Sequence, residues 1–292
     1  MPRPRASHPA IAVAALLAAL LAGCAPTASP SEPVDPAGLA DITVSVGQGR
    51  VDVAGGRIFV LVENGRDEPI TVRSLKVRTA GFEPGIADDD PTDFPAGRAI
   101  AIRLAPTDAI CDAAPDPITV ELDVVSEAGS ARGELPADDA YGALARIHDQ
   151  ACLGEAVAGI AAITLPDHLR STGSGADRRA VIDVAIAPAG SGAGSFRIDL
   201  VSGTTLIQAE GAHDWVLDLD VAADDPPSTL ELAVAPNRCD AHAVAEDKVG
   251  SILPFDVTTS DGLSGTVPFA ASTTLRSELY AYYAERCGLP TG

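Results

Sequence analysis

The amino-acid sequence predicts a mainly β protein: two tandem β-sandwich domains, each ending in a short α-helix that a disulfide ties back to the sheets. Three observations predict this fold: short strand-like segments between turn residues, an internal repeat, and an even number of cysteines beyond the N-terminal leader. The chain of 292 residues is long enough for two domains of ordinary size. Because 46% of the residues are hydrophobic but only 4% are aromatic, we expect cores of valine, isoleucine, leucine and alanine.

Short runs rich in valine and isoleucine recur along the chain, and turn-forming pairs such as Gly55-Gly56 and Asn64-Gly65 separate them. Residues 215–221 alternate apolar side chains with aspartates, which is the pattern of a strand with one buried and one solvated face. Several short strands at this spacing favour a β-sandwich over a mixed α/β fold. The expected strands cover residues 42–46, 57–62, 70–77, 99–104, 118–125, 180–187, 195–201, 215–221, 229–234 and 252–258.

The chain carries the same pattern twice, which is the signature of an internal repeat. Five matches occur in the same order in both halves, with only small insertions between them. The matches, first copy before second, are residues 100–106 with 230–236, Cys111-Asp112-Ala113 with Cys239-Asp240-Ala241, Asp123-Val124 with Asp256-Val257, residues 133–136 with 265–268, and Cys152 with Cys287.

Each copy closes with a short amphipathic helix that ends at a cysteine. The expected apolar faces hold Leu144, Ile147 and Ala151 in the first copy, and Leu275, Leu279, Tyr282 and Tyr283 in the second.

The ends of these helices are predicted from their flanking residues. Asp138 or Asp139 and Thr273 are the expected N-caps, because their side-chain oxygens can accept from the free backbone N–H groups of a first turn. Gly154 and Gly288 follow the two helix cysteines and are the expected C-terminal stops.

Four cysteines remain once Cys24 is set aside, and an even number in an exported chain implies disulfides. Spacing alone allows three pairings. If the two copies are equivalent, each holds its own bridge: Cys111 with Cys152, and Cys239 with Cys287. With its short strands and its tied helix, each copy resembles an immunoglobulin-like domain.

The N-terminus reads as a signal peptide. Arg3 and Arg5 form a basic region, and residues 10–22 form an apolar run too short and too abruptly ended for a spanning helix. The sequence Leu21-Ala22-Gly23-Cys24 then resembles the lipobox of bacterial lipoproteins. That resemblance implies cleavage before Cys24, a diacylglyceryl group on its sulfur, and a further acyl chain such as palmitate on its amino group.

These features predict four segments: a signal peptide over residues 1–23, a lipidated Cys24 and tether over 24–39, and sandwich domains over 40–154 and 155–292. The tether is rich in proline, serine and alanine and has no periodicity, as expected of an extended linker. The predicted localisation is the extracytoplasmic face of a cell membrane, with the covalent lipid as the membrane contact.

The charge excludes some partners. A formal net charge of −21 repels phosphate backbones and anionic headgroups, so we expect no nucleic-acid binding and no electrostatic membrane binding.

The sequence contains few patterns typical of catalytic or metal-binding sites. No Gly-x-Ser-x-Gly segment surrounds a serine, and the remaining cysteines are expected to be oxidised, so we predict neither an enzyme nor a cofactor. Calcium is a weak candidate at two acidic runs, because carboxylate oxygens are its preferred ligands, but neither run has the spacing of a calcium loop. The candidate ligands are Asp88, Asp89, Asp90, Asp218, Asp220 and Asp224.

Tyr280 is a weak candidate for a binding residue, because it should lie off the Leu275–Leu279 face of the last helix. The lone tryptophan, Trp215, is expected in the core.

The leading hypothesis is a non-enzymatic binding or structural module of the cell envelope, with an envelope protein or a glycan as its partner. The alternative is a substrate-capturing lipoprotein of a membrane transporter. That class needs two α/β lobes, and the sequence has no alternating strand–helix pattern.

Overall fold

The computed structural model describes residues 36–289, apart from positions 193, 241, 243, 245, 246 and 248. The signal peptide, Cys24 and most of the tether therefore lie outside the described residues. Within the described part of the chain, no helix is both long enough and apolar enough to cross a bilayer.

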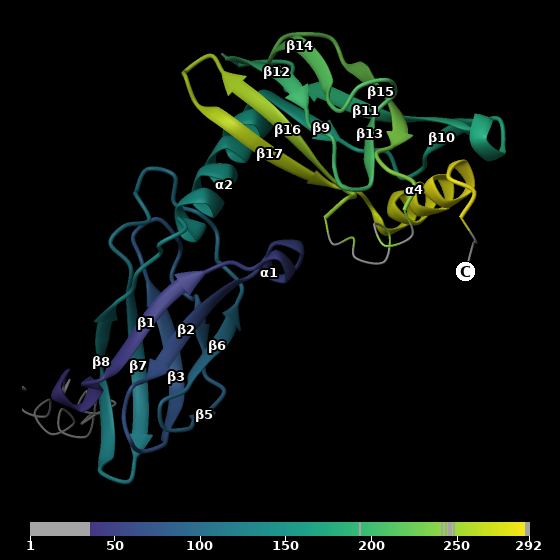
Figure 1. Ribbon diagram of the computed structural model, residues 1–292. Helices are drawn as coiled ribbons and strands as arrows, with labels where there is room; N and C mark the ends of the chain where they lie inside the picture. The colour runs from purple at the N-terminus through teal and green to yellow at the C-terminus, as the bar shows by residue number, and fades with distance from the viewer. Residues whose placement is uncertain are drawn as a thin grey trace, which may run out of the picture. The chain divides into compact units, whose positions relative to one another are not determined.

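The first domain is an antiparallel sandwich of two sheets (Figure 1). One sheet has the order β1-β2-β6 and the other β4-β3-β7-β8, with β5 also paired to β3. A 3-10 turn, Pro36–Leu39, precedes β1, and the short helix α1 (Arg50–Ala54) links β1 to β2. The strands are β1 (Ile42–Gly47), β2 (Ile58–Asn64), β3 (Ile70–Arg78), β4 (Ala87–Asp88), β5 (Thr92–Phe94), β6 (Ala99–Leu104), β7 (Thr119–Ser126) and β8 (Gly129–Pro136).

The second domain repeats this strand order. Its sheets run β10-β11-β15-β13, with β9 also on β11, and β14-β12-β16-β17. A second 3-10 turn, Gly175–Asp177, precedes β11. The strands are β9 (Ala161–Thr164), β10 (Arg170–Thr172), β11 (Arg179–Pro188), β12 (Ser195–Val201), β13 (Ile207–Ala209), β14 (Trp215–Ala222), β15 (Ser228–Pro236), β16 (Ile252–Thr259) and β17 (Ser264–Ala270).

Both domains are thus immunoglobulin-like sandwiches, as predicted. Every expected strand is present, with its ends within two residues of the expected positions. The cores are aliphatic as the composition requires: Val60 and Leu122 are fully buried in the first, and Ile182 and Leu232 in the second.

A β-bulge lies at the same place in both domains, at a pair of matched dipeptides. Arg73 is the extra residue in β3, opposite Asp123-Val124 of β7. Asp199 is the extra residue in β12, opposite Asp256-Val257 of β16. The matched dipeptides therefore mark a conformation that both copies share.

The first helix is longer than predicted. Helix α2 runs Ala143–Ile160, so Gly154 lies inside it and does not stop it, and the predicted domain boundary at 154/155 falls within the helix. Leu144 packs into the first core, whereas Leu153 and Val157 pack into the second. The helix continues because the residues after Cys152 bury a further apolar face.

The second helix ends where expected. Helix α4 runs Thr273–Arg286, and Gly288 follows in the left-handed region with φ of 62°. The N–H of Gly288 donates to the carbonyl of Glu285, and that of Leu289 to Ala284. These two bonds form a Schellman motif.

The predicted N-caps were partly wrong. Ser272, not Thr273, caps α4, and its hydroxyl accepts from the N–H of Leu275 at 3.1 Å. Gly142 occupies the N-cap position of α2. The Asp139 carboxylate nevertheless accepts from the N–H groups of Ala143 and Leu144, at 2.7 and 2.8 Å. These N–H groups of the first turn therefore have a hydrogen-bond partner, although Asp139 lies before the helix.

Substituting alanine at the two equivalent glycines should have opposite effects. Gly154→Ala should raise the free energy of unfolding by about 0.5–1 kcal/mol, because alanine favours a helix and its Cβ would meet Val267 at an ordinary 3.8 Å. Gly288→Ala should lower it by about 1–2 kcal/mol, because an L-residue is strained at positive φ. Denaturant unfolding of both variants measures the difference, and the same sign for both would contradict this account of the two helix ends.

Candidate functional site

In each domain, a disulfide joins the closing helix to the loop that links the two sheets. Cys111, between β6 and β7, bonds to Cys152 of α2, with 5.4 Å between the Cα atoms. Cys239, between β15 and β16, bonds to Cys287 at the end of α4, with 5.1 Å between the Cα atoms. Both predicted pairings are confirmed. Each bridge closes a loop of more than forty residues, which the chain-entropy model values at about 4 kcal/mol.

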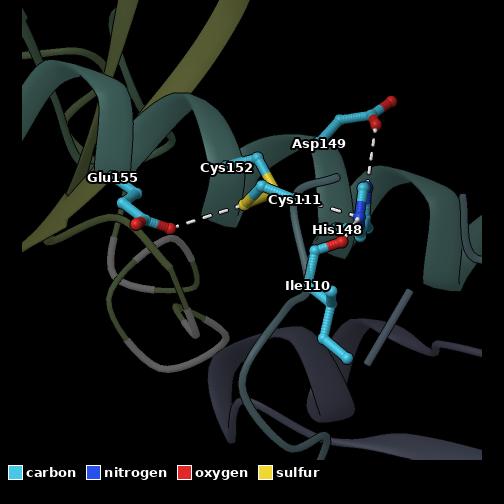
Figure 2. The surroundings of a disulfide bond; sticks show 6 residues. All are labelled: Ile110, Cys111, His148, Asp149, Cys152 and Glu155. Atoms are coloured by element: carbon cyan, nitrogen blue, oxygen red, sulfur yellow. Dashed lines mark hydrogen bonds and ion pairs between the residues drawn. A yellow bond between two sulfur atoms is a disulfide. The ribbon is translucent and has the colours of Figure 1, made fainter. Parts of the chain in front are cut away.

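A hydrogen bond reinforces each bridge one helical turn before the helix cysteine. In the first domain, Nε2 of His148 lies 3.1 Å from the carbonyl oxygen of Ile110, the residue before Cys111 (Figure 2). In the second, the hydroxyl of Tyr283 donates to the carbonyl of Arg238, the residue before Cys239. A carbonyl only accepts, so the bond between His148 and Ile110 places a proton on Nε2 of His148.

The surroundings of the first bridge are polar on its outer side. Figure 2 shows Asp149 beside the other ring nitrogen of His148, at 3.4 Å, and the Glu155 carboxylate 3.4 Å from Sγ of Cys111. A disulfide sulfur has no proton to donate, so the Glu155 contact is a close approach and not a hydrogen bond.

The loop held by the first bridge supports a second loop, residues 79–86, which connects β3 to β4. The N–H of Ile110 donates to the carbonyl of Gly81 at 2.9 Å, and the N–H of Glu83 donates to Asp108 at 2.8 Å. The ring of Phe82 packs edge-on against His148, with 5.9 Å between centroids. The disulfide, the histidine and the β3–β4 loop are therefore one connected structure.

A cavity of about 410 Å³ lies under the β3–β4 loop. Its lining includes the exposed Pro84 and the half-buried Ala87, together with Val77, Phe82 and Ile86, which are at most 6% exposed. Lys76, Arg78 and Glu83 are the charged residues of the lining. This volume lies within the usual range for small-molecule sites, which combine apolar walls with a few polar groups.

Of the two cations in this lining, Arg78 forms ion pairs with Glu121 and Glu134, whereas Lys76 forms none with the described residues. Arg78 and Arg132 bind separate oxygens of Glu121. The hydrogen bond from Arg78 is the main cause that lowers the pKa of Glu121 and keeps it ionised. Lys76 sits directly opposite Glu121 across β3 and β7. Among the residues that the structure describes, no carboxylate lies within ion-pair distance of its ammonium group.

The acidic residues considered for calcium are not gathered into a site. No three His, Cys, Asp or Glu side chains of the described residues are placed to hold a metal ion. Asp88 lies in β4, where its carboxylate accepts from the N–H of Asp90 at 3.4 Å, and Asp89 is exposed beside it. In the other run, Asp218 lies in the bulge of β14, with φ of 46°. Asp220 of β14 is paired with Arg197 of β12, and Asp224 is exposed in a turn.

The aromatic candidates are engaged within the second domain. The hydroxyl of Tyr280 donates to Asp247 at 2.7 Å, and burial raises the pKa of Tyr280 to about 12. The indole N–H of Trp215 donates to the carbonyl of Ala233 at 2.8 Å, and its ring lies in the core as expected. Tyr280 therefore joins α4 to the loop that carries Cys239.

Sequence reasoning did not identify the cavity. The available signal was Phe82, an aromatic residue beside a turn in a chain with few aromatics.

Comparison with known proteins identifies no family. No protein-family model matches the chain, and no curated protein sequence matches it.

The similar solved structures are distant. The YadV chaperone is 16% identical, over 78% of this chain and 100% of the chaperone, with a TM-score of 0.24. Red sea bream transglutaminase is 12% identical, and the match covers 80% of this chain but only 31% of the enzyme, with a TM-score of 0.24. A chaperone–tip adhesion subunit complex of Acinetobacter baumannii is 12% identical, over 74% of this chain and 92% of the matched chain, with a TM-score of 0.20. Likenesses at this level carry no inference about activity or partners.

Removing the hydroxyl of Tyr283 tests the hydrogen bond that lies one helical turn before the second bridge. Tyr283→Phe keeps the buried ring but leaves the carbonyl of Arg238 and the N–H of Asp240 without their partner. We expect a loss of about 1–2 kcal/mol in the free energy of unfolding, measured by denaturant titration. Tyr141→Phe is the matched control: Tyr141 is 89% exposed and should change stability by less than about 0.5 kcal/mol. Equal effects of the two variants would contradict a structural role for the Tyr283 hydroxyl.

Glu278 of α4 and His168 form an exposed ion pair that should make stability depend on pH. Glu278 accepts from Nδ1 of His168 at 2.8 Å and from the N–H of Leu169. The hydrogen bond with Glu278 raises the pKa of His168 above its ordinary value of about 6.5, and the same bond lowers the pKa of Glu278 below its ordinary value of about 4.3.

The contribution of His168 is therefore complete below about pH 6.5 and disappears as pH rises through its folded-state pKa. That of Glu278 is complete above about pH 4.3 and disappears on acidification. We expect the difference in Tm between the native protein and His168→Gln to be largest between these values. NMR titration should place the pKa of His168 above 6.5 in the native protein and lower in Glu278→Gln, and an unchanged pKa in that variant would contradict the pairing.

Proposed function

We propose that the protein is a lipid-anchored, non-enzymatic binding module on the extracytoplasmic face of a cell membrane. The observation that carries the binding role is the cavity of the first domain, which is backed by a loop that a disulfide and His148 hold to α2. Small-molecule sites are usually cavities of about this size that are formed before the ligand binds.

The proposed location rests on the lipobox-like sequence that ends at Cys24, on the proline-rich tether, and on the two disulfides. Disulfides persist in oxidising compartments outside the cytoplasm. Because all four described cysteines are oxidised, none of them offers the thiolate that a cysteine nucleophile or a zinc site needs. The antiparallel sheets of both domains favour this module over a transporter-associated lipoprotein with α/β lobes.

The anchor is tested by labelling cells with an alkyne analogue of palmitate. The native protein should carry the label, and Cys24→Ala should lose it while retaining the signal peptide in its mass. A Cys111→Ala/Cys152→Ala variant controls for labelling of other cysteines. Equal labelling of the native protein and Cys24→Ala would refute lipidation at Cys24.

The binding role is tested by crosslinking in intact cells, followed by gentle purification and mass spectrometry of whatever co-purifies. Ala87 lines the cavity and is half-buried, so Ala87→Phe should fill the space without disturbing the buried core. A compound or envelope protein enriched with the native chain and depleted with Ala87→Phe would support the proposal. Identical sets from two folded proteins would instead make the chain a spacer.

A further inference from the structure

We infer that two copies of this chain associate, with helix α1 of one copy against strand β14 of the other. The contact joins exposed valines flanked by arginines to an exposed valine flanked by aspartates. Neither surface belongs to the lining of the cavity, so the contact goes beyond the proposed ligand-binding role.

Helix α1 has its acidic residue facing the protein and its apolar residues facing solvent. Asp52 is 2% exposed, whereas Val51 and Val53 are 58% and 45% exposed. Arg103 donates to the Asp52 carboxylate at 2.8 Å, and the N–H of Gly49 donates to it at 3.0 Å. These bonds satisfy the buried carboxylate and fix α1 at the end of β1 in an orientation that leaves both valines in water (Figure 1).

Exposed large apolar side chains are rare in the part of the chain that the structure describes. The exposed ones are Val51, Val53, Tyr141, Val216 and Leu263. Single apolar residues at a surface are ordinary, but neighbouring ones mark contact sites more often. Helix α1 has only five residues and carries two of these side chains, which makes it the first place to look for a contact.

Two arginines flank the valines of α1. Arg50 begins the helix, and Nε of Arg57 lies 3.1 Å from the point that a Cβ on Gly55 would occupy, directly after the helix. Both arginines are exposed, and neither forms an ion pair with another described residue. Because the ion pair beneath α1 is neutral, this surface is positive in a chain whose formal charge is −21. We call it the basic patch, and it consists of Arg50, Val51, Val53 and Arg57.

Strand β14 carries a surface of the opposite charge in the second domain. It is the edge strand of its sheet, with β12 beside it (Figure 1). Val216 is 72% exposed, and Asp218 and Asp220 are exposed further along the same strand. Asp224 is exposed in the turn that follows. We call these four residues the acidic patch.

The cation beside the acidic patch does not neutralise it. Arg197 is paired with Asp220 across β12 and β14, but its Nε donates to Asp199 at 2.7 Å. The hydrogen bond with Asp199 is the main cause that raises the pKa of Arg197, and the charges of Asp218 and Asp220 raise it further. One guanidinium therefore faces three carboxylates, and the surplus negative charge is open to a partner.

The two patches are complementary in charge, and each offers apolar surface to the other. Both are exposed in the single chain, so neither covers the other. Electrostatic complementarity selects partners and fixes how they meet, and burial of the valines adds a favourable term. The chain itself thus supplies the acidic, valine-bearing surface that the basic patch requires, and the partner is a second copy.

The test uses the full-length chain in intact cells, as two co-expressed forms with different epitope tags. The photocrosslinker p-benzoylphenylalanine replaces Val51 in one form. We expect ultraviolet light to give a product that carries both tags, with the crosslink mapped by mass spectrometry to residues 215–224 of the other copy. The same probe at Leu263, which is 46% exposed before β17, should give little of this product.

Charge reversal in both forms tests the two patches separately and together. Arg50→Glu/Arg57→Glu should lower the double-tagged product about tenfold, because opposite charges become like charges. Asp220→Lys/Asp224→Lys should lower it by a similar factor. This pair avoids Asp218, whose positive φ makes substitution there a strain. The variant with all four substitutions should restore most of the product.

Asp89→Lys/Asp90→Lys is the matched control. It changes the charge by the same amount at two exposed residues of the first domain and should leave the product unchanged. Ala87→Phe, which fills the cavity, should leave it unchanged as well. The contact between copies and the ligand-binding role can therefore fail independently.

Three outcomes would overturn the inference. They are the absence of double-tagged product from position 51, an equal amount of it from position 263, and no recovery in a fourfold variant that reaches the native level in cells. A crosslink from position 51 to a different protein alone would also reject self-association and would assign α1 to that protein.

Discussion

The attachment of the closing helix to the loop between the two sheets is the constraint on which both domains depend. In each copy, a disulfide and a hydrogen bond one helical turn earlier fix the same two pieces of chain. Packing also holds these helices: Leu275, Leu279, Tyr282 and Tyr283 of α4 are buried in the second core. The covalent and polar attachment adds to this packing at the cysteine end of each helix.

The two copies reach the same geometry with different chemistry. His148 and Tyr283 occupy equivalent positions, and each reaches the carbonyl of the residue before the loop cysteine. The requirement at this position is a donor of suitable length, not a particular residue type. In the first domain, His148 also packs against Phe82, which is one of the residues that line the cavity. In the second domain, the hydroxyl of Tyr283 donates to the carbonyl of Arg238 and accepts from the N–H of Asp240.

Periodicity predicted the central strands because their burial alternates along the chain, as in β7 and β16. The strands β8 and β17 contain glycine and proline, which are depleted in strands, so pairing with a neighbouring strand forms them and their local sequence does not predict them. The short strands β4, β5 and β13 depend in the same way on the strands beside them. The bridges followed from the repeat and not from spacing.

The helix ends and the site were harder to predict, because both depend on contacts distant in sequence. Gly154 and Gly288 follow equivalent cysteines, yet only Gly288 adopts a positive φ. The difference lies in the next residues: α2 continues into Leu153, Val157 and Ile160, which find a second core to enter. The cavity brings the end of β3 together with the loop that follows it, and the loop before β7 supports it. No single segment carries that arrangement.

The continuity of α2 has a consequence for how a duplicated protein behaves. Simple duplication produces two modules that can be separated or exchanged, because each ends before the next begins. Here one helix has its first turns in one core and its last turns in the other, so loss of either core frays a helix that the other needs. The boundary between the two copies therefore lies inside a helix that both cores use, and cutting the chain there would leave each core without part of its helix.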